Sequence, residues 1–226
     1  MKVLVLGAGA GGGFPQWNSN AAACNRARAG DVAAPPRTQA SLAVSADGQH
    51  WFLFNASPDL RQQIEATPEL RPRGGLRSTP IAGVVLTGGD VDAIAGLLTL
   101  RERQALSVYA TAKVQAILKA NPIFEVLAHD VVARRTLPLD RPSELALADG
   151  SASGLTVELF AVPGKVPLYL EEREGTMAAF AGLKVKRKIL VHINNSNPVL
   201  LADTSERAEL EAAGWEVAHD GMRLSL

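Results

Sequence analysis

The residues best suited to chemistry lie where two apolar segments end. Thr87-Gly88-Gly89-Asp90-Val91-Asp92 follows the apolar run 81–86, so two carboxylates stand two positions apart where a predicted strand stops. In α/β sheets, ligands bind beyond the carboxyl ends of the strands. Asp90 and Asp92 can both reach one cation as oxygen ligands, or either of them caps the helix expected to follow.

A histidine ends the second segment. His192 closes the apolar run 188–193 and leads into Asn194-Asn195-Ser196-Asn197-Pro198. Imidazole is a common metal ligand and proton carrier, although a lone histidine is more often structural. The asparagines either hold a loop through side-chain to backbone bonds or orient a ligand. Three other histidines are expected at the surface: His50, His129 and His219.

A glycine-rich stretch follows the first apolar run. Gly7-Ala8-Gly9-Ala10-Gly11-Gly12 matches the G-x-G-x-x-G dinucleotide fingerprint. That motif needs a helix directly afterwards, and Gly13-Phe14-Pro15 resists one. The acidic partner, expected roughly 20 residues further on, is only Asp31. The alternative is a tightly turned loop that lines a pocket.

Composition excludes several classes of protein. The 226 residues are 47% apolar, and 23 basic residues balance 23 acidic ones. A neutral chain has no broad electrostatic footprint for nucleic acid or an anionic membrane. The single cysteine, Cys24, excludes a disulfide framework and any cysteine-rich structural zinc site. The first apolar run is too short for a signal peptide or membrane span, so we expect a cytoplasmic protein without membrane insertion, either a monomer or a homodimer.

Predicted strands cluster early and then alternate with helices, which favours an α/β sandwich formed by one domain, residues 1–226. The expected strands are 3–6, 39–44, 51–55, 81–86, 107–110, 155–162, 188–193, 215–218 and 222–226. The expected helices lie within 20–30, after Ser57 as N-cap, and at 94–102, 112–120 and 206–213, the last ended by Gly214.

Six segments in order resemble the family of coenzyme PQQ synthesis protein B. They are 10–18, 37–41, 55–59, 96–102, 192–198 and 220–222. The resemblance implies a metallo-β-lactamase-like αββα sandwich and a role in making pyrroloquinoline quinone (PQQ) from a Glu-Tyr crosslinked precursor. The activity implied is hydroxylation of the tyrosine ring with iron and dioxygen. The alternative is a non-catalytic carrier of PQQ or its precursor toward the periplasm.

The resemblance also implies metal ligands. The superfamily motif H-x-H-x-D-H falls on Gly88, Asp90, Asp92 and Ala93, so only Asp92 matches. Relatives keep Asp-His here, and Ala93 departs from them. His192 matches a later metal-binding histidine. Asp92 and His192 are therefore the expected catalytic metal ligands, with Asp90 as a third, for iron or zinc.

An acidic small-molecule precursor needs its own contacts. The candidates for binding it are Gly12, Gly13, Arg37 and Asn195. Arg37 is the natural carboxylate clamp, because its guanidinium forms bidentate hydrogen bonds. A nicotinamide-dependent oxidoreductase is the third reading, and it requires a helix directly after Gly13.

Two further departures from the family affect zinc and length. Relatives hold a structural zinc with C-x-C-x-x-C, whose positions here are Ser19, Ala21 and Cys24, so that zinc is not expected. Relatives also have several tens of residues more near the charged run 171–175. We therefore predict that a segment is missing between Glu172 and Gly175, by deletion or by omission from the sequence.

Overall fold

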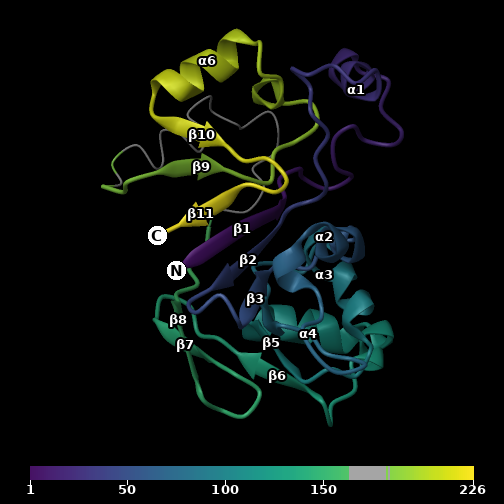
Figure 1. The fold of residues 1–226 in the computed structure, drawn as a ribbon, viewed down its shortest axis with the longest axis vertical. Helices are drawn as coiled ribbons and strands as arrows, with labels where there is room; N and C mark the ends of the chain where they lie inside the picture. Colours follow the sequence, from purple (N-terminus) through teal and green to yellow (C-terminus); the bar gives the residue numbers. More distant parts are fainter. Residues whose placement is uncertain (163–181, 183) are drawn as a thin grey trace.

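A seven-stranded sheet forms the centre of the molecule in the computed structural model, which describes residues 1–162, 182 and 184–226 (Figure 1). Its strand order is β11-β1-β2-β3-β4-β5-β6. The strands are β1 Lys2–Gly7, β2 Ser41–Ser45, β3 Trp51–Phe54, β4 Ile81–Val85, β5 Leu106–Ala110, β6 Val132–Thr136 and β11 Arg223–Ser225. Neighbours from β11 to β3 run antiparallel, whereas β3 to β6 run parallel.

The parallel half of the sheet positions the site. Every residue of β4 and β5 is buried, as expected for apolar strands covered on both faces. Because β3 to β6 share one direction, their carboxyl ends meet at one edge of the sheet. The segment 86–92, which carries both aspartates, leaves the sheet at this edge.

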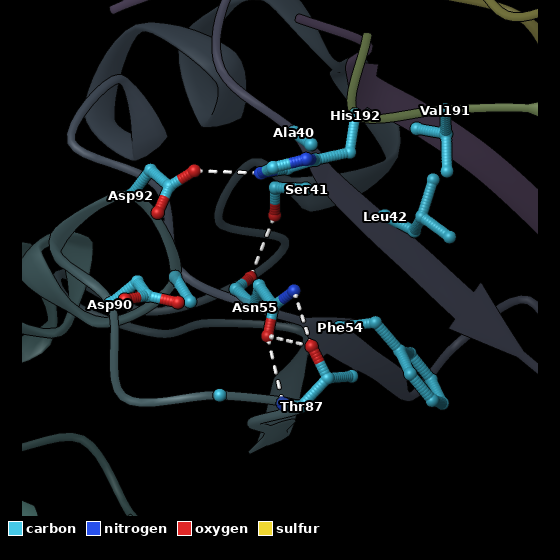
Figure 2. Close-up of a pocket in the computed structure, with 12 residues that line it drawn as sticks. Ala40, Ser41, Leu42, Phe54, Asn55, Thr87, Asp90, Asp92, Val191 and His192 are labelled. Atoms are coloured by element: carbon cyan, nitrogen blue, oxygen red, sulfur yellow. Dashed lines mark hydrogen bonds and ion pairs between the residues drawn. The ribbon is translucent and has the colours of Figure 1, made fainter. Parts of the chain in front are cut away.

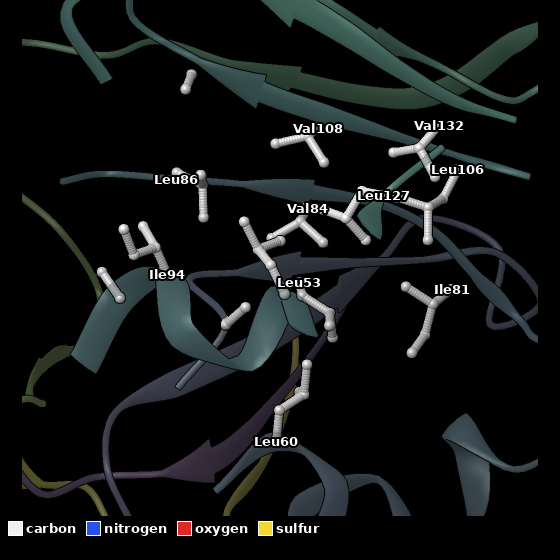
Figure 3. Packing of buried hydrophobic residues seen from close by; sticks show 14 of the residues in the cluster. Leu53, Leu60, Ile81, Val84, Leu86, Ile94, Leu106, Val108, Leu127 and Val132 are labelled. Atoms are coloured by element: carbon white, nitrogen blue, oxygen red, sulfur yellow. The ribbon is translucent and has the colours of Figure 1, made fainter. Parts of the chain in front are cut away.

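Helices cover one face of this sheet (Figures 1 and 3). They are α2 Leu60–Ala66, α3 Val91–Ile94, the 3₁₀ turn Ala95–Leu100 and α4 Ala112–Ala120. The largest core cluster joins helices and strands, and includes Leu53, Leu60, Val84, Leu86, Ile94, Leu97, Val108 and Leu118. Burial of such side chains stabilises the fold by roughly 1.5–3 kcal/mol each.

A hairpin covers the opposite face. It consists of β7 Ser143–Ala146 and β8 Ala152–Val157, and it packs through Leu145 and Leu155 against Phe52 and Val85 of the large sheet. The Tyr109 hydroxyl donates to the Ala146 carbonyl at 3.0 Å and accepts from the Ala146 amide at 2.9 Å. The hairpin is therefore held by both packing and hydrogen bonds.

The rest of the described chain forms a second group of elements at the other end of the view in Figure 1. It contains α1 Ala22–Arg28, α6 Ser205–Ala212 and the parallel pair β9 Lys188–Leu190 and β10 Trp215–Val217. Its core holds Phe14, Cys24, Leu200, Leu210 and Trp215. The helices that flank the sheets confirm the predicted α/β class.

Several local predictions were wrong. Ser57 does not cap a helix, because its hydroxyl donates to Gln63 Oε1 at 3.0 Å and the helix begins at Leu60 after Asp59. The helix expected at 94–102 begins at Val91 and becomes a 3₁₀ turn at Ala95. Strands β6 and β7 were not predicted.

Two further points concern the extent of the chain. The segment predicted to be missing between Glu172 and Gly175 lies outside the described residues. Within the part of the chain that the structure describes, no helix combines the length and apolar character needed to cross a bilayer.

Candidate functional site

The acidic strand end and the distant histidine meet in space (Figure 2). Asp92 Oδ2 lies 2.7 Å from His192 Nε2. The Asp92 side chain is 17% exposed and that of His192 is 54% exposed. The pair therefore sits at the mouth of a cavity, with the carboxylate on the inner side.

The strand-to-helix turn after β4 positions Asp92. Asp92 lies in the first turn of α3, and the Ala93 carbonyl accepts a hydrogen bond of 2.7 Å from the Ala56 amide. Asp90 occupies the N-cap position, but its side chain makes no capping hydrogen bond. The Asp90 carboxylate therefore does not cap the helix, and Asp90 lines the cavity instead.

The glycine-rich loop positions His192. The Ile193 amide donates to the Ala8 carbonyl at 3.1 Å, and the Ala10 amide donates to the Ile193 carbonyl at 2.9 Å. These bonds hold His192 at a φ of 62°, a left-handed conformation that non-glycine residues adopt rarely and that surrounding structure must enforce. A Cβ on Gly11 would lie 3.4 Å from Asp92 Oδ2, so this loop also walls the carboxylate.

The conformation of the same loop excludes dinucleotide binding at the G-x-G-x-x-G match. Residues 11–13 form a turn, and the first helix after the glycines begins only at Ala22. A pyrophosphate site of this kind needs a helix N-terminus directly after the loop. The glycine motif therefore serves to position the histidine.

The cavity has a volume of about 410 Å³ and lies at the carboxyl edge of the parallel strands. Its apolar wall includes Leu42, Phe54 and Val191, and its polar wall includes Asp90 and Asp92 (Figure 2). Among the described residues that line it there is no lysine or arginine. The cavity is thus acidic on one side and apolar on the other.

Sequence reasoning missed a polar support at the floor of this cavity. The Asn55 side chain accepts from the Thr87 amide at 2.9 Å and donates to the Thr87 hydroxyl at 2.9 Å. The Ser41 hydroxyl donates to the Asn55 carbonyl at 2.8 Å. Asn55 adopts a φ of 62°. An asparagine directly after an apolar strand was the available signal, because asparagine tolerates this conformation better than most residues.

Three of the expected substrate contacts lie outside the cavity. The Gly12 amide donates to Gln39 Oε1 at 3.0 Å, and the Gly13 amide donates to the Ala10 carbonyl at 2.9 Å. The Asn195 side chain donates to Gln16 Oε1. The structure therefore places these three residues in the loop framework and does not bring them to Asp92 and His192.

Arg37 is not placed as a carboxylate clamp for this cavity either. It is 5% exposed, and its guanidinium donates to the carbonyls of Ala218 at 3.1 Å, Pro35 at 2.9 Å and Leu200 at 3.3 Å. Burial of a charged side chain requires such partners. The sequence identified the residue type but could not show which way the side chain would turn.

The Asp92–His192 pair fits a metal bound through two protein donors. Two donors bound to one ion at roughly 2.1 Å each lie roughly 3 Å apart, close to the 2.7 Å separation observed. Among the described residues, however, no three His, Cys, Asp or Glu side chains gather to hold an ion. Asp90 lines the same cavity without completing such a group, and Ala93 offers no donor.

Comparison with known proteins agrees with the fold. Residues 50–181 match the family model described as a beta-lactamase superfamily domain. Coenzyme PQQ synthesis protein B of Gluconacetobacter diazotrophicus is 48% identical over 305 positions, which cover 100% of this chain and 99% of the relative. The protein of that name from Rhodopseudomonas palustris (strain TIE-1) is 42% identical over 309 positions, covering 100% of both chains. Since this chain has 226 residues, those alignments open gaps within it.

Solved structures agree as well. The crystal structure of Zn²⁺-bound PqqB from Methylobacterium extorquens superposes with a TM-score of 0.90 at 39% identity, covering 100% of both chains. A diphosphatase from the PhnP family superposes with a TM-score of 0.68 at 18% identity, over 99% of this chain and 96% of the other, which shows a shared fold alone. By full-length identity and by structure, this chain belongs to the coenzyme PQQ synthesis protein B family of the β-lactamase superfamily.

Proposed function

We propose that this protein acts in PQQ biosynthesis as a metal-dependent hydroxylase of the tyrosine ring of the Glu-Tyr-derived precursor. The observation that carries the proposal is the 2.7 Å contact between Asp92 Oδ2 and His192 Nε2 at a cavity mouth. A bound iron ion would supply dioxygen activation there. Zinc has no redox chemistry, so hydroxylation favours iron.

The cavity's charge supports a cation in this role. Asp90 and Asp92 line the cavity, and the described lining residues supply no positive side chain to balance them. An acidic precursor is repelled by two carboxylates unless a cation lies between them. Asp92 and His192 would hold the ion, and a site with only two protein ligands would leave room for oxygen and precursor.

The apolar wall would bind the aromatic ring. Phe54, Leu42 and Val191 line the cavity opposite the acidic side. Aromatic and aliphatic walls orient a planar ring and exclude water from it.

A second function, non-catalytic carriage of PQQ or its precursor, is favoured by one observation. The family resemblance implies a histidine at position 93, where this chain has alanine, and the described residues supply two donors rather than three. Fewer protein donors weaken the hold on the ion. A carrier tolerates that loss, whereas an oxygenase loses turnover.

Anaerobic loading with Fe(II), followed by precursor, dioxygen and a two-electron reductant, tests the two functions. Hydroxylation places one oxygen atom in a ring C–H bond and releases the other as water. The hydroxylase proposal expects oxygen uptake matched to hydroxylated product, with loss of both in Asp92→Asn. Tight precursor binding without product would support the carrier and contradict the hydroxylase.

A further inference from the structure

A second cavity, with a volume of about 260 Å³, lies apart from the Asp92–His192 pair. Its described lining includes Arg37, Leu200, Arg207, Val217 and His219. Among described residues, the two cavities have no lining residue in common. Two guanidinium groups, one imidazole and one carboxylate, that of Asp220, line this cavity.

Arg37 presents an unused donor group to this second cavity. Its Nε and Nη1 atoms donate to three backbone carbonyls, at 2.9–3.3 Å. Its Nη2 group has no hydrogen-bond partner among the residues that the structure describes, and this atom is not one of the fully buried side-chain atoms that lack a partner. A guanidinium carries five N–H donors, so the Nη2 group can donate to an acceptor that enters the cavity.

Arg207 faces the same cavity. Its side chain is 17% exposed, with Nε 2.6 Å from Glu211 Oε1 and Nη1 3.2 Å from the Val199 carbonyl. Its Nη2 group likewise lacks a partner within the described part of the chain. Burial first, and then the charge of Arg207, lowers the pKa of Arg37, whereas the charge of Asp220 acts in the opposite direction. The two guanidinium groups therefore repel each other across the cavity.

The nearby carboxylate is already engaged. Asp220 accepts from the Thr38 amide and hydroxyl, each at 2.7 Å, and from the Ala8 amide at 3.0 Å. His219 lies at the exposed rim, where its Nδ1 is 3.1 Å from the Asp220 carbonyl oxygen. The cavity thus holds two guanidinium groups and an imidazole, and Asp220 directs its carboxylate to other donors.

We propose that this cavity is a binding site for a small oxyanion, a carboxylate or phosphate held between Arg37 and Arg207. Planar guanidinium forks match the oxygen spacing of both groups. The site is independent of the Asp92–His192 cavity, so it stands whether or not that cavity hydroxylates a precursor.

Isothermal titration calorimetry of the whole protein with inorganic phosphate, and separately with succinate, tests the site at constant ionic strength. We expect saturable binding of at least one anion. The anion that binds shows whether the site prefers a phosphate or a carboxylate. Arg207→Gln weakens that binding at least about tenfold through loss of a charge-assisted contact. Arg103→Gln is the matched control, because Arg103 pairs with Asp130 on the surface.

A second variant separates loss of anion binding from loss of the fold. His219→Gln changes an exposed residue at the rim, and it should weaken anion binding while the circular dichroism spectrum stays unchanged. No saturable binding of either anion to the wild-type protein would overturn the proposal. So would unchanged affinity in both folded variants.

Discussion

Asp92 and His192 stand 100 positions apart in the chain, yet one oxygen and one nitrogen of their side chains lie 2.7 Å apart. Two separate sets of backbone hydrogen bonds produce this contact. The Ala56 amide holds the Asp92 helix against the sheet edge, and the glycine-rich loop holds the histidine segment. The pair is therefore preorganised by backbone hydrogen bonds, which reduces the cost of binding a ligand between the two groups.

Removal of either donor should weaken metal binding. In Asp92→Asn or His192→Gln, one donor remains, so we expect the affinity for Fe(II) to fall by at least about tenfold. Competition against a chromogenic chelator measures this. His129→Gln is the matched control, because His129 Nε2 contacts Glu125 Oε2 at the same 2.7 Å on the surface. Equal losses in all three variants would refute the assignment.

Adding a histidine at position 93 should strengthen the site. Ala93 lines the cavity directly beside Asp92, so Ala93→His adds a nitrogen donor. We expect metal affinity to rise at least about tenfold, since ligand count sets the strength of such sites. The same chelator competition reports it. Unchanged affinity would mean that position 93 does not face the ion.

Close packing at Gly96 should prevent that position from accepting a side chain. A Cβ there would lie 2.1 Å from the Ser57 carbonyl oxygen and 2.8 Å from backbone atoms of Ala56. We expect Gly96→Ala to lower the free energy of unfolding by at least about 2 kcal/mol through overpacking. Gly74→Ala is the control, because nothing lies within 4 Å of its Cβ position. Urea denaturation of both variants measures the difference.

Asp220 should make stability depend on pH. Burial raises the pKa of Asp220 above its ordinary 3.8, against the lowering effect of the Thr38 and Ala8 hydrogen bonds. The folded state therefore binds this proton more tightly than the unfolded state. The resulting stability is fully present below pH 3.8 and is lost as pH rises through the folded pKa.

The comparison with Asp220→Asn isolates this effect. The free energy of unfolding of the wild-type protein, minus that of the variant, should fall as the pH rises from 3.8 through the folded pKa of Asp220. Chemical denaturation at several pH values supplies both curves. A difference that rises with pH would show that the carboxylate is favoured in the folded state.

Much of the fold could be predicted from the sequence. Long apolar runs gave the buried strands, and the helix at 112–120 has the expected bounds because Thr111 caps it and Asn121-Pro122 ends it. β6 was missed because only its first residue is buried, so an edge strand shows no apolar alternation. Ser57 failed as a cap because Gln63, a tertiary partner, binds its hydroxyl.

The site was predictable in part. A carboxylate after a buried strand pointed to Asp92. His192 follows β9, which pairs with β10 outside the seven-stranded sheet, so only the family resemblance joined it to Asp92. Arg37 was assigned to substrate on residue type alone, and its actual direction depends on the carbonyls of Ala218 and Leu200, far away in sequence. Asn55 was overlooked because its partner, Thr87, lies 32 positions away in the sequence.

The most direct test is crystallographic. Crystals soaked anaerobically in Fe(II) and measured at the iron edge should show one anomalous peak between Asp92 Oδ2 and His192 Nε2, at roughly 2.0–2.2 Å from each. The peak should vanish in crystals of Asp92→Asn. An ion bound elsewhere, or no peak beside this pair, would contradict the assignment of the metal site.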